Sequence, residues 1–480
     1  MNKRLTLKLV GKVLQVESAL MTAPLLVSLI MGGGDAKSIL ISLIITLAVG
    51  SALALLRPRR DMLRAQEGFA VVGFSWILLS FFGGLPFFFS GAIPSMVDCF
   101  FETVSGFTTT GASILTDIEA LPSGLLFWRS FTHWAGGMGV LVLSLALIPK
   151  MGARSIYLMR AESPGPSTDK LVPRIANNSK ILYAIYVGLS VSMIVALLCC
   201  GLSLYDALVH MFGAAGTGGF SVYGASIAHY DSAAVDIVIG VFMALFGVNF
   251  ALYFFLLRRN WRAALANSEL RMYLILLLGS TVVIALDIMP QYGERFFTAL
   301  RYSFFQVSSI MTTTGYATAD FDAWPQMSRV LLVALMFVGA CAGSTGGGIK
   351  VIRVQLLVKT MLRDIRRTVH PKSVNTIKLD GHAVNEDVLS GVNVFFFAYF
   401  FILIAATIVV SFDGFSFETN VTSVVATLSN IGPGLGMVGP TGSYAAFSNL
   451  SKLVLSLCML IGRLEIFPIL MLFAPSAWKR

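Results

Sequence analysis

The sequence carries little charge for its length. Of its 480 residues, 12% are Asp, Glu, Lys or Arg and 56% are hydrophobic, whereas about 25% of the residues in an ordinary soluble domain are charged. A soluble chain of this length would divide into roughly two or three domains with polar surfaces. The apolar residues lie instead in runs of about 20, the length that a helix needs to cross a hydrocarbon core of roughly 30 Å. We therefore expect an integral membrane protein.

Cysteine is also scarce, and the patterns that mark common enzymes are missing. The five cysteines lie mostly in apolar runs without metal-ligand spacing, which indicates small core residues rather than a disulfide framework; they are Cys99, Cys199, Cys200, Cys341 and Cys458. The sequence has no HExxH or GxSxG motif and no paired carboxylates within the apolar runs. It also has no nucleotide-binding fingerprint. These absences argue against an enzyme and against a nucleotide bound by this chain.

The positions of the charged residues along the chain indicate that the net charge of +10 reflects membrane topology. Basic residues cluster before the first apolar run, after the second, and at 150–180, 258–262, 350–372 and 479–480. The loops between these clusters are mostly acidic. Basic loops face the cytoplasm, so we expect both termini to be cytoplasmic and no nucleic acid to be bound. The acidic loops then face outward, where they either attract cations or are merely solvated.

The apolar runs repeat as a unit, which predicts the fold. Two spans come first, at 13–31 and 37–56; then a long run, a short segment ending in small residues and Gly, and a second long run recur four times. The expected units are 69–89, 98–113 and 124–148; 180–201, 204–221 and 233–257; 271–289, 296–317 and 327–362; and 391–411, 417–436 and 450–473. The corresponding division is 1–60 for the N-terminal helix pair and 61–150, 151–260, 261–370 and 371–480 for the repeats. We expect an all-α membrane protein of ten full spans, with four pseudo-symmetric repeats of helix, pore helix, filter loop and helix around a central pore.

The short segments are too short to cross and end in Gly-rich chain. Such backbone is tolerated at membrane depth only where protein surrounds it or it lines a water-filled path. The four stretches are Thr108-Thr109-Thr110-Gly111, Gly216-Thr217-Gly218-Gly219, Thr312-Thr313-Thr314-Gly315 and Ile431-Gly432-Pro433-Gly434. We align the glycines Gly111, Gly219, Gly315 and Gly434.

Rings of backbone carbonyls can replace the hydration shell of K⁺. Glycine permits the positive φ that turns successive carbonyls toward one axis. Thr hydroxyls can add oxygens at the inner end, and the negative ends of the short helices favour a cation. The four loops therefore predict a pore for a monovalent cation, K⁺ most of all, with the ion bound at these residues.

The four loops, the ten spans and the stretch from Asn430 to Gly436 resemble the Trk/Ktr/HKT superfamily of K⁺ transport proteins. The two extra N-terminal spans and residues 161–166 are similar to the TrkH/TrkG-type membrane subunits of bacterial Trk systems. The resemblance implies K⁺ uptake across the bacterial inner membrane. Relatives that admit Na⁺ tend to have Ser where this chain has Gly111, so the filter is expected to prefer K⁺. Loops 2 and 4 depart from the TTTG form, which predicts looser selectivity than four identical strands would give.

The resemblance also implies partners. It predicts a homodimer with one pore in each protomer, and a cytosolic TrkA-type ring of regulatory subunits that bind NAD(H) or ATP. The basic segments 150–180 and 350–390 suit the docking of such a regulator, although contact with membrane lipid is the alternative for many of these charges. K⁺ is then the transported ion, no cofactor is bound covalently, and any nucleotide belongs to the partner.

A glycine-rich stretch interrupts the second long run of the third repeat; it comprises Gly343, Ser344, Thr345, Gly346, Gly347 and Gly348. Each interior Gly costs a helix about 1 kcal/mol relative to Ala. A phosphate-binding loop is excluded because Ile349 separates Gly348 from Lys350. The stretch is either a kinked helix packed through its glycines or, as the resemblance implies, an intramembrane loop that gates the pore below the filter.

Several charged and aromatic residues lie within apolar runs. A charge such as Arg463 costs at least about 2.5–3.5 kcal/mol on insertion scales, so it should face protein or water. It either forms a structural ion pair, for example with Glu465, or contacts the glycine-rich loop as a fixed charge below the filter, which the resemblance favours. Trp128, Arg129, His133 and Trp134 are interpreted as structural, because aromatics at a span end suit an interfacial belt. Glu102 either steadies the first pore helix or lies near the outer mouth.

A symporter that couples K⁺ to H⁺ or Na⁺ is the alternative function. It would need a membrane-buried titratable group on the path. The spans offer few, Glu465 and His133 among them.

Overall fold

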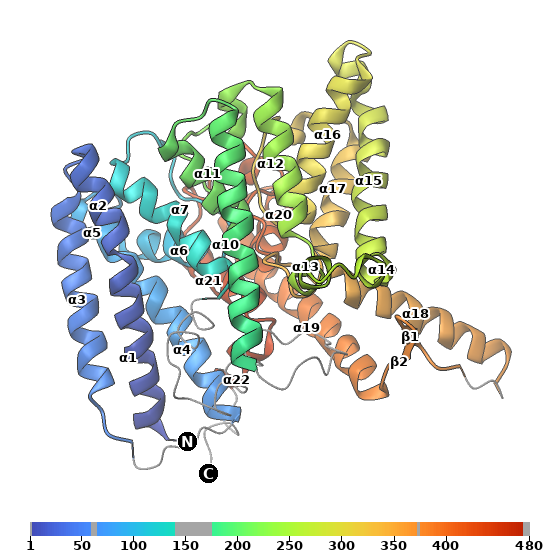
Figure 1. Ribbon diagram of the computed structural model, residues 1–480, viewed down its shortest axis with the longest axis horizontal. Helices are drawn as coiled ribbons and strands as arrows, with labels where there is room; N and C mark the ends of the chain where they lie inside the picture. Colours follow the sequence, from blue (N-terminus) through green and yellow to red (C-terminus); the bar gives the residue numbers. More distant parts are fainter. Residues whose placement is uncertain (1, 59–64, 140–174, 372–374, 474–480) are drawn as a thin grey trace.

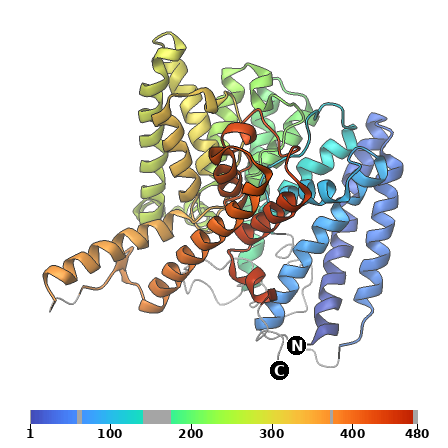
Figure 2. The same ribbon diagram turned by 180° about the vertical axis from the view of Figure 1, so that it is seen from behind.

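The computed structural model describes residues 2–58, 65–139, 175–371 and 375–473, and almost all of its regular structure is helical (Figures 1 and 2). The N-terminal helices are α1 (Lys3–Leu20), α2 (Thr22–Met31) and α3 (Ala36–Ala54). Helix α1 continues into α2 as one span, so this span begins ten residues earlier than the apolar run at 13–31 predicted. Helices α1 and α3 pack closely through small residues, since a Cβ on Gly11 would lie 2.6 Å from the carbonyl oxygen of Gly50.

The remaining elements follow the same order four times. The first set is α4 (Ala65–Gly83), α5 (Leu85–Ser90), α6 (Met96–Phe107) and α7 (Ser123–Gly137). The second is α10 (Ile175–Cys199), α11 (Leu204–Gly216), η2 (Ser226–Tyr230), α12 (Ala233–Phe246), α13 (Phe250–Leu257) and α14 (Trp261–Ala266). The third is α15 (Ser268–Ile288), η3 (Met289–Tyr292), α16 (Phe296–Met311), η4 (Phe321–Ala323), α17 (Gln326–Val338) and α18 (Val351–Val369). The fourth is α19 (Glu386–Val410), η5 (Ser411–Asp413), α20 (Phe417–Leu428), η6 (Gly436–Val438), α21 (Asn449–Arg463) and α22 (Phe467–Phe473).

The short helices α6, α11, α16 and α20 lie at the expected pore-helix positions, and three of them begin at a serine cap. The hydroxyls of Ser95, Ser203 and Ser416 accept hydrogen bonds from the backbone N–H three residues later, at 3.4, 3.1 and 3.2 Å. Such caps satisfy an N–H group that a helix start leaves unpaired. The acidic residues Asp98, Asp206 and Glu418 in their first turns suit the positive end of the helix dipole.

The second long helix is interrupted in the second, third and fourth repeats, whereas the sequence indicated an interruption only in the third, at the glycine-rich stretch 343–348. Helices α12 and α13 meet at 94°, helix α17 is separated from α18 by residues 339–350, and α21 from α22 by 464–466. Six helices of the described residues are long and apolar enough to cross a membrane, or seven if the bent pair is one span. The breaks at 247–249 and 464–466 lie within apolar sequence, so hydropathy alone does not reveal them, whereas the glycines at 343–348 mark the break in the third repeat. These spans make the chain a multi-pass membrane protein.

Among the described residues, one small two-stranded element lies outside the helical body (Figure 1). Strands β1 (Lys378–Leu379) and β2 (His382–Ala383) pair antiparallel beside the protruding helix α18. Leu379 of β1 packs with Ile352 and Leu356 in a separate small cluster, which the flanking residues Ile377 and Val384 join. The five cysteines are free thiols; Cys99, Cys341 and Cys458 are buried as expected of core residues, whereas Cys200 is partly exposed and Cys199 is exposed.

Candidate functional site

The four pore helices end in the same turn. After each helix one residue has a left-handed backbone, with φ of 56, 58, 59 and 57° at Thr109, Thr217, Thr313 and Asn430. The next N–H donates to the carbonyl five residues earlier in every case, over 2.8 to 2.9 Å; the pairs are Thr110 to Ser105, Gly218 to Gly213, Thr314 to Ser309 and Ile431 to Ala426. This is a helix C-cap with a left-handed residue. Asn430 therefore takes the place of the three threonines.

This turn corrects the alignment of the fourth loop. Gly432, with φ of 96°, takes the position of Gly111, Gly219 and Gly315, whose φ values are 81, 74 and 84°. Gly434, which the sequence alignment placed there, lies two residues further on against the side chains of Thr422 and Val438. We therefore define loops 1 to 4 as residues 108–111, 216–219, 312–315 and 429–432.

The four glycines join the loops into a closed ring. The position that a Cβ would take lies within 2.0 to 2.6 Å of a carbonyl oxygen of the next loop in every case. The contacts run from Gly111 to Gly218, from Gly219 to Thr314, from Gly315 to Ile431 and from Gly432 back to Thr110. No side chain fits in such a gap, and an L-residue rarely adopts the positive φ. Glycine at these four positions thus lets four backbones surround one axis.

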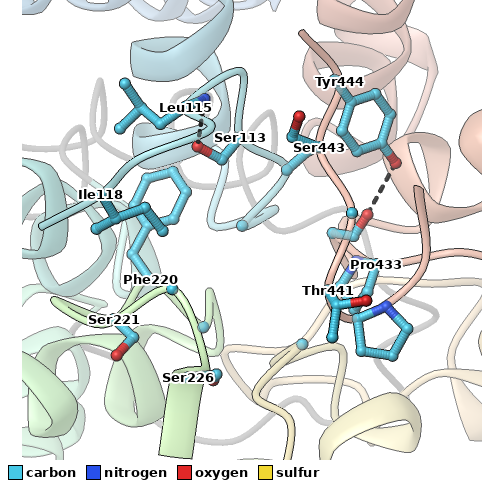
Figure 3. Close-up of a pocket in the computed structure, with 18 of the residues that line it drawn as sticks. Ser113, Leu115, Ile118, Phe220, Ser221, Ser226, Pro433, Thr441, Ser443 and Tyr444 are labelled. Atoms are coloured by element: carbon cyan, nitrogen blue, oxygen red, sulfur yellow. Dashed lines mark hydrogen bonds between the residues drawn. The ribbon is translucent and has the colours of Figure 1, made fainter. Parts of the chain in front are cut away.

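One cavity of about 340 Å³ opens beside this ring, and all four glycines line it (Figure 3). Ser113 and Phe220 reach it from the first and second repeats, and Pro433 and Tyr444 from the fourth. The Tyr444 hydroxyl donates to the carbonyl oxygen of Gly432 at 2.8 Å, and the Tyr444 N–H donates to that of Ser113 at 2.8 Å. The segment after η6 thereby ties the fourth loop to the first at the mouth of the cavity.

The threonine hydroxyls of the loops mostly form hydrogen bonds within the protein. The hydroxyls of Thr108 and Thr312 each donate back to a pore-helix carbonyl at 2.6 Å. Each also lies 2.8 Å from the hydroxyl two residues later, that of Thr110 or Thr314. The Thr217 hydroxyl donates to the carbonyl oxygen of Gly216 at 2.6 Å. These bonds hold the loop backbones in place and engage the threonine hydroxyls within the protein.

The glycine-rich stretch is a non-helical segment that lies across the inner ends of loops 3 and 4. It runs from 339 to 350, wider than the predicted 343–348. The Gly347 N–H donates to the Thr313 hydroxyl at 2.6 Å. A Cβ on Gly346 would lie 2.8 Å from the Thr312 carbonyl oxygen, and one on Gly347 2.3 Å from that of Ser429. The kinked-helix interpretation is therefore wrong.

Arg463 ties this segment to the first repeat. Its Nη1 donates to the carbonyl oxygen of Thr345 at 2.8 Å. Its Nη2 donates to those of Gly136 and Gly137 at 2.5 and 2.8 Å, at the end of α7. Glu465, the partner that the sequence suggested, forms an ion pair with Arg353. The guanidinium thus contacts the glycine-rich segment and, within the described part of the chain, forms no ion pair with Glu465.

Two further side chains anchor the 339–350 segment, and the sequence did not single them out. Glu269, 3% exposed at the start of α15, accepts the N–H of Ala342 at 2.7 Å and that of Ile352 at 3.3 Å. The Lys350 ammonium donates to the carbonyl oxygen of Gly346. Glu269 reads in the sequence as an ordinary first-turn acid of a helix, so no local signal distinguishes it.

The first repeat holds a buried ion pair beside the ring. Arg129 Nε lies 2.6 Å from Glu102 Oε1, and both side chains are at most 2% exposed. Glu102 also accepts hydrogen bonds from Ser113 and Ile114, while Arg129 donates to the carbonyl oxygen of Ser221 at 3.1 Å. Glu102 therefore steadies the outer part of the first repeat. Trp128 does not belong to an interfacial belt, since it is 1% exposed and packs inside the protein, whereas the neighbouring Trp134 is half-buried.

The chain is similar to known proteins along its whole length. A family model described as "TrkH: Cation transport protein" matches residues 35–480. The Trk system potassium uptake protein TrkH of Salmonella typhimurium is 39% identical, and the match covers 100% of both chains. TrkG of Escherichia coli K12 is 33% identical over 87% of this chain and 86% of its own. The crystal structure of the potassium transporter TrkH from Vibrio parahaemolyticus matches with a TM-score of 0.88 at 34% identity, over 100% of each chain.

Proposed function

Because this chain belongs to the TrkH family of cation transport proteins, we propose that it carries K⁺ into the cell across the bacterial inner membrane. The observation that carries the proposal is the closed ring of loops 1 to 4, in which four backbones face one axis beside one cavity. Rings of backbone carbonyls can replace the water around K⁺. The four pore helices end at this ring, and the negative ends of their dipoles favour a cation. The ring is the proposed selectivity filter.

The proposed gate is the 343–348 stretch together with Arg463. It lies directly beneath loops 3 and 4, and its backbone contacts Thr313, Ser429 and Arg463. A fixed positive charge at this depth repels an ion that leaves the filter, because the low dielectric inside protein strengthens the interaction. Movement of this segment is therefore expected to open the path.

K⁺ uptake can proceed by passive flux through a pore or by transport coupled to a second ion. Glu465 is a half-buried carboxylate within the last apolar run, two residues from Arg463, and a symporter coupled to H⁺ or Na⁺ would use a titratable group in such a span. Its ion pair with Arg353 favours a fixed structural charge. We therefore favour a channel-like pore and keep symport as the second candidate.

The proposed assembly is a homodimer that docks a cytosolic TrkA-type ring, with both termini of this chain in the cytoplasm. The exposed arginines Arg366 and Arg367 of α18 support a docking surface for the ring. The side chains of Met361 and Ile365 on the same helix are also exposed and support contact with a second copy or with lipid. Much of the basic segment 150–180, including residues 161–166, lies outside the described residues. NAD(H) or ATP would bind the ring, not this chain.

Ion flux into liposomes containing the purified protein tests the function. K⁺ and Na⁺ gradients are imposed separately while the pH is clamped. We expect passive K⁺ flux that exceeds Na⁺ flux and that rises in Arg463→Ala. Replacement of Gly111 by Ser is expected to lower K⁺ flux, because a Cβ there would lie 2.0 Å from the carbonyl oxygen of Gly218. Flux that requires a proton or Na⁺ gradient, and that stops in Glu465→Gln, would establish the symporter instead.

A further inference from the structure

Loop 2 lacks the side chains that brace loops 1 and 3. In those loops a threonine pair, Thr108 with Thr110 or Thr312 with Thr314, lies hydroxyl to hydroxyl at 2.8 Å and is tied to its own pore helix. The equivalent positions of loop 2 are Gly216 and Gly218. Without side chains at these two positions, loop 2 cannot form this brace. Something else must fix its distance from the axis.

The imidazole of His133 fills the space behind loop 2. A Cβ on Gly218 would lie 2.4 Å from both Cγ and Nδ1 of His133, and one on Gly216 would lie 2.2 Å from the His133 carbonyl oxygen. His133 comes from α7 of the first repeat and is completely buried. The imidazole of a neighbouring repeat therefore occupies the volume at Gly218, and the His133 backbone occupies the volume at Gly216, that threonine side chains take up in loops 1 and 3.

His133 is itself held in a fixed orientation. Its Nδ1 lies 2.7 Å from the carbonyl oxygen of Gly106, near the end of the first pore helix. Since a carbonyl can only accept, Nδ1 carries the proton. The ring centroid lies 4.1 Å from that of Phe220, which follows Gly219, and Arg129 covers Phe220 at 3.5 Å. The imidazole is thus wedged between the end of pore helix α6 and the backbone of loop 2.

Histidine is an unusual residue at a buried position where the side chain only fills space. His133 Nε2 is buried and forms no hydrogen bond with any described residue. An unpaired buried polar group destabilises a protein by about 1–3 kcal/mol, which an apolar side chain would avoid. The histidine keeps the bond to Gly106 and contributes a flat ring of fixed orientation against Gly218. This combination suits a spacer that sets a distance.

We propose that His133 is a positioning residue that sets how far loop 2 lies from the axis, and thereby sets the discrimination between K⁺ and Na⁺. The inference rests on the proposed function, since it requires loop 2 to be part of a K⁺ filter. Without the imidazole ring, loop 2 can move away from the axis. The filter then no longer matches the size of K⁺. The ring itself does not touch the ion.

The test compares four variants by the ratio of K⁺ to Na⁺ flux in liposomes. His133→Ala is expected to lower the ratio on the order of tenfold, which corresponds to about 1.4 kcal/mol of discrimination. His133→Asn can still donate to Gly106 and is expected to lie between Ala and the native protein. Gly218→Thr alone clashes with the imidazole and is expected to lose flux. The double variant with His133→Ala and Gly218→Thr is expected to regain flux and part of the selectivity.

Phe131→Ala is the matched control. Phe131 lies on the same helix, is 8% exposed, stacks on Phe127 and meets Phe212 edge-on, and it is not among the nearest neighbours of a Cβ at Gly216 or Gly218. It is expected to lower the unfolding temperature in detergent at least as much as His133→Ala while leaving the flux ratio unchanged. A native ratio in folded His133→Ala would overturn the inference, and so would ratios that merely follow the unfolding temperature in all variants. If the native protein shows no preference for K⁺, the proposed function fails first, independently of His133.

Discussion

The side-chain amide of Asn430 donates a hydrogen bond to the Thr110 hydroxyl, 2.9 Å away and 320 positions distant in the sequence. The same Nδ2 donates to the carbonyl oxygen of Met459 at 2.9 Å. Asn430 is the left-handed residue of loop 4, where the other loops have threonine. Its amide therefore joins the last loop to the first and to α21, at the point where the ring closes.

Replacement of Asn430 by Ala is expected to open this closure. It removes two buried hydrogen bonds, which costs about 1–3 kcal/mol, and it leaves alanine in a left-handed conformation that asparagine tolerates better. We expect a lower unfolding temperature in detergent and a smaller rise of that temperature when K⁺ is added. Asn430→Asp cannot donate either bond and is expected to resemble Ala. A rise as large as that of the native protein in both variants would contradict a role of this amide in the ring.

The corrected alignment of loop 4 makes a second prediction. A Cβ on Gly432 would meet the Thr110 carbonyl oxygen at 2.6 Å, and φ is 96°. Strain of this kind costs about 1–3 kcal/mol, and the clash is with backbone that cannot turn away. Gly434 has no such φ, and its nearest neighbours are side-chain atoms of Thr422 and Val438. Gly432→Ala is therefore expected to abolish K⁺ flux, while Gly434→Ala lowers it mildly. Equal effects, or the reverse order, would restore the alignment at Gly434.

The membrane architecture was predictable because long apolar runs and serine-capped short helices are local features. The register of loop 4 was not, because the alignment matched glycines rather than the turn that precedes them. Asn430 was the available signal: asparagine tolerates the left-handed backbone, so Asn430-Ile431-Gly432 could have been matched to Thr109-Thr110-Gly111. The residue types alone support this match only weakly, and the hydrogen-bond pattern that the four loops share establishes it.

The breaks in the second helices were only partly predictable. Glycine density revealed the stretch at 343–348, but its outer limits at Gly339 and Lys350 depend on backbone angles, with φ of 72 and 81°. The turn at Glu465 and Ile466, with φ of 53 and 71°, occurs in residues that normally avoid such angles. Tertiary contacts such as the ion pair of Glu465 with Arg353 hold that turn. The sequence pattern alone does not contain them.

Glu269 provides a third prediction, on the anchoring of the 339–350 segment. Its carboxylate accepts the N–H groups of Ala342 and Ile352, which flank the proposed gate. Hydrogen bonds to a charged group contribute about 1.5–3 kcal/mol each. We expect Glu269→Ala to raise basal K⁺ flux in liposomes, since the segment loses both anchors. Glu269→Gln keeps an acceptor oxygen and is expected to remain near the native flux. Unchanged flux in the folded Ala variant would exclude an anchoring role.

The buried pair of Glu102 and Arg129 leads to the last prediction. Removal of one partner of a buried ion pair leaves an uncompensated charge and costs about 3–5 kcal/mol, whereas replacement of both by apolar residues is often nearly neutral. Glu102→Gln is therefore expected to lower the unfolding temperature in detergent strongly, and Arg129→Met less, since the remaining carboxylate keeps the N–H of Ile114. The double variant is expected to be more stable than Glu102→Gln alone. A double variant whose loss of stability equals the sum of both single losses would mean that the two side chains act independently.

The same double variant is also expected to show a lower K⁺ to Na⁺ flux ratio, even where its stability recovers, because Arg129 donates a hydrogen bond to the carbonyl oxygen of Ser221 just after loop 2.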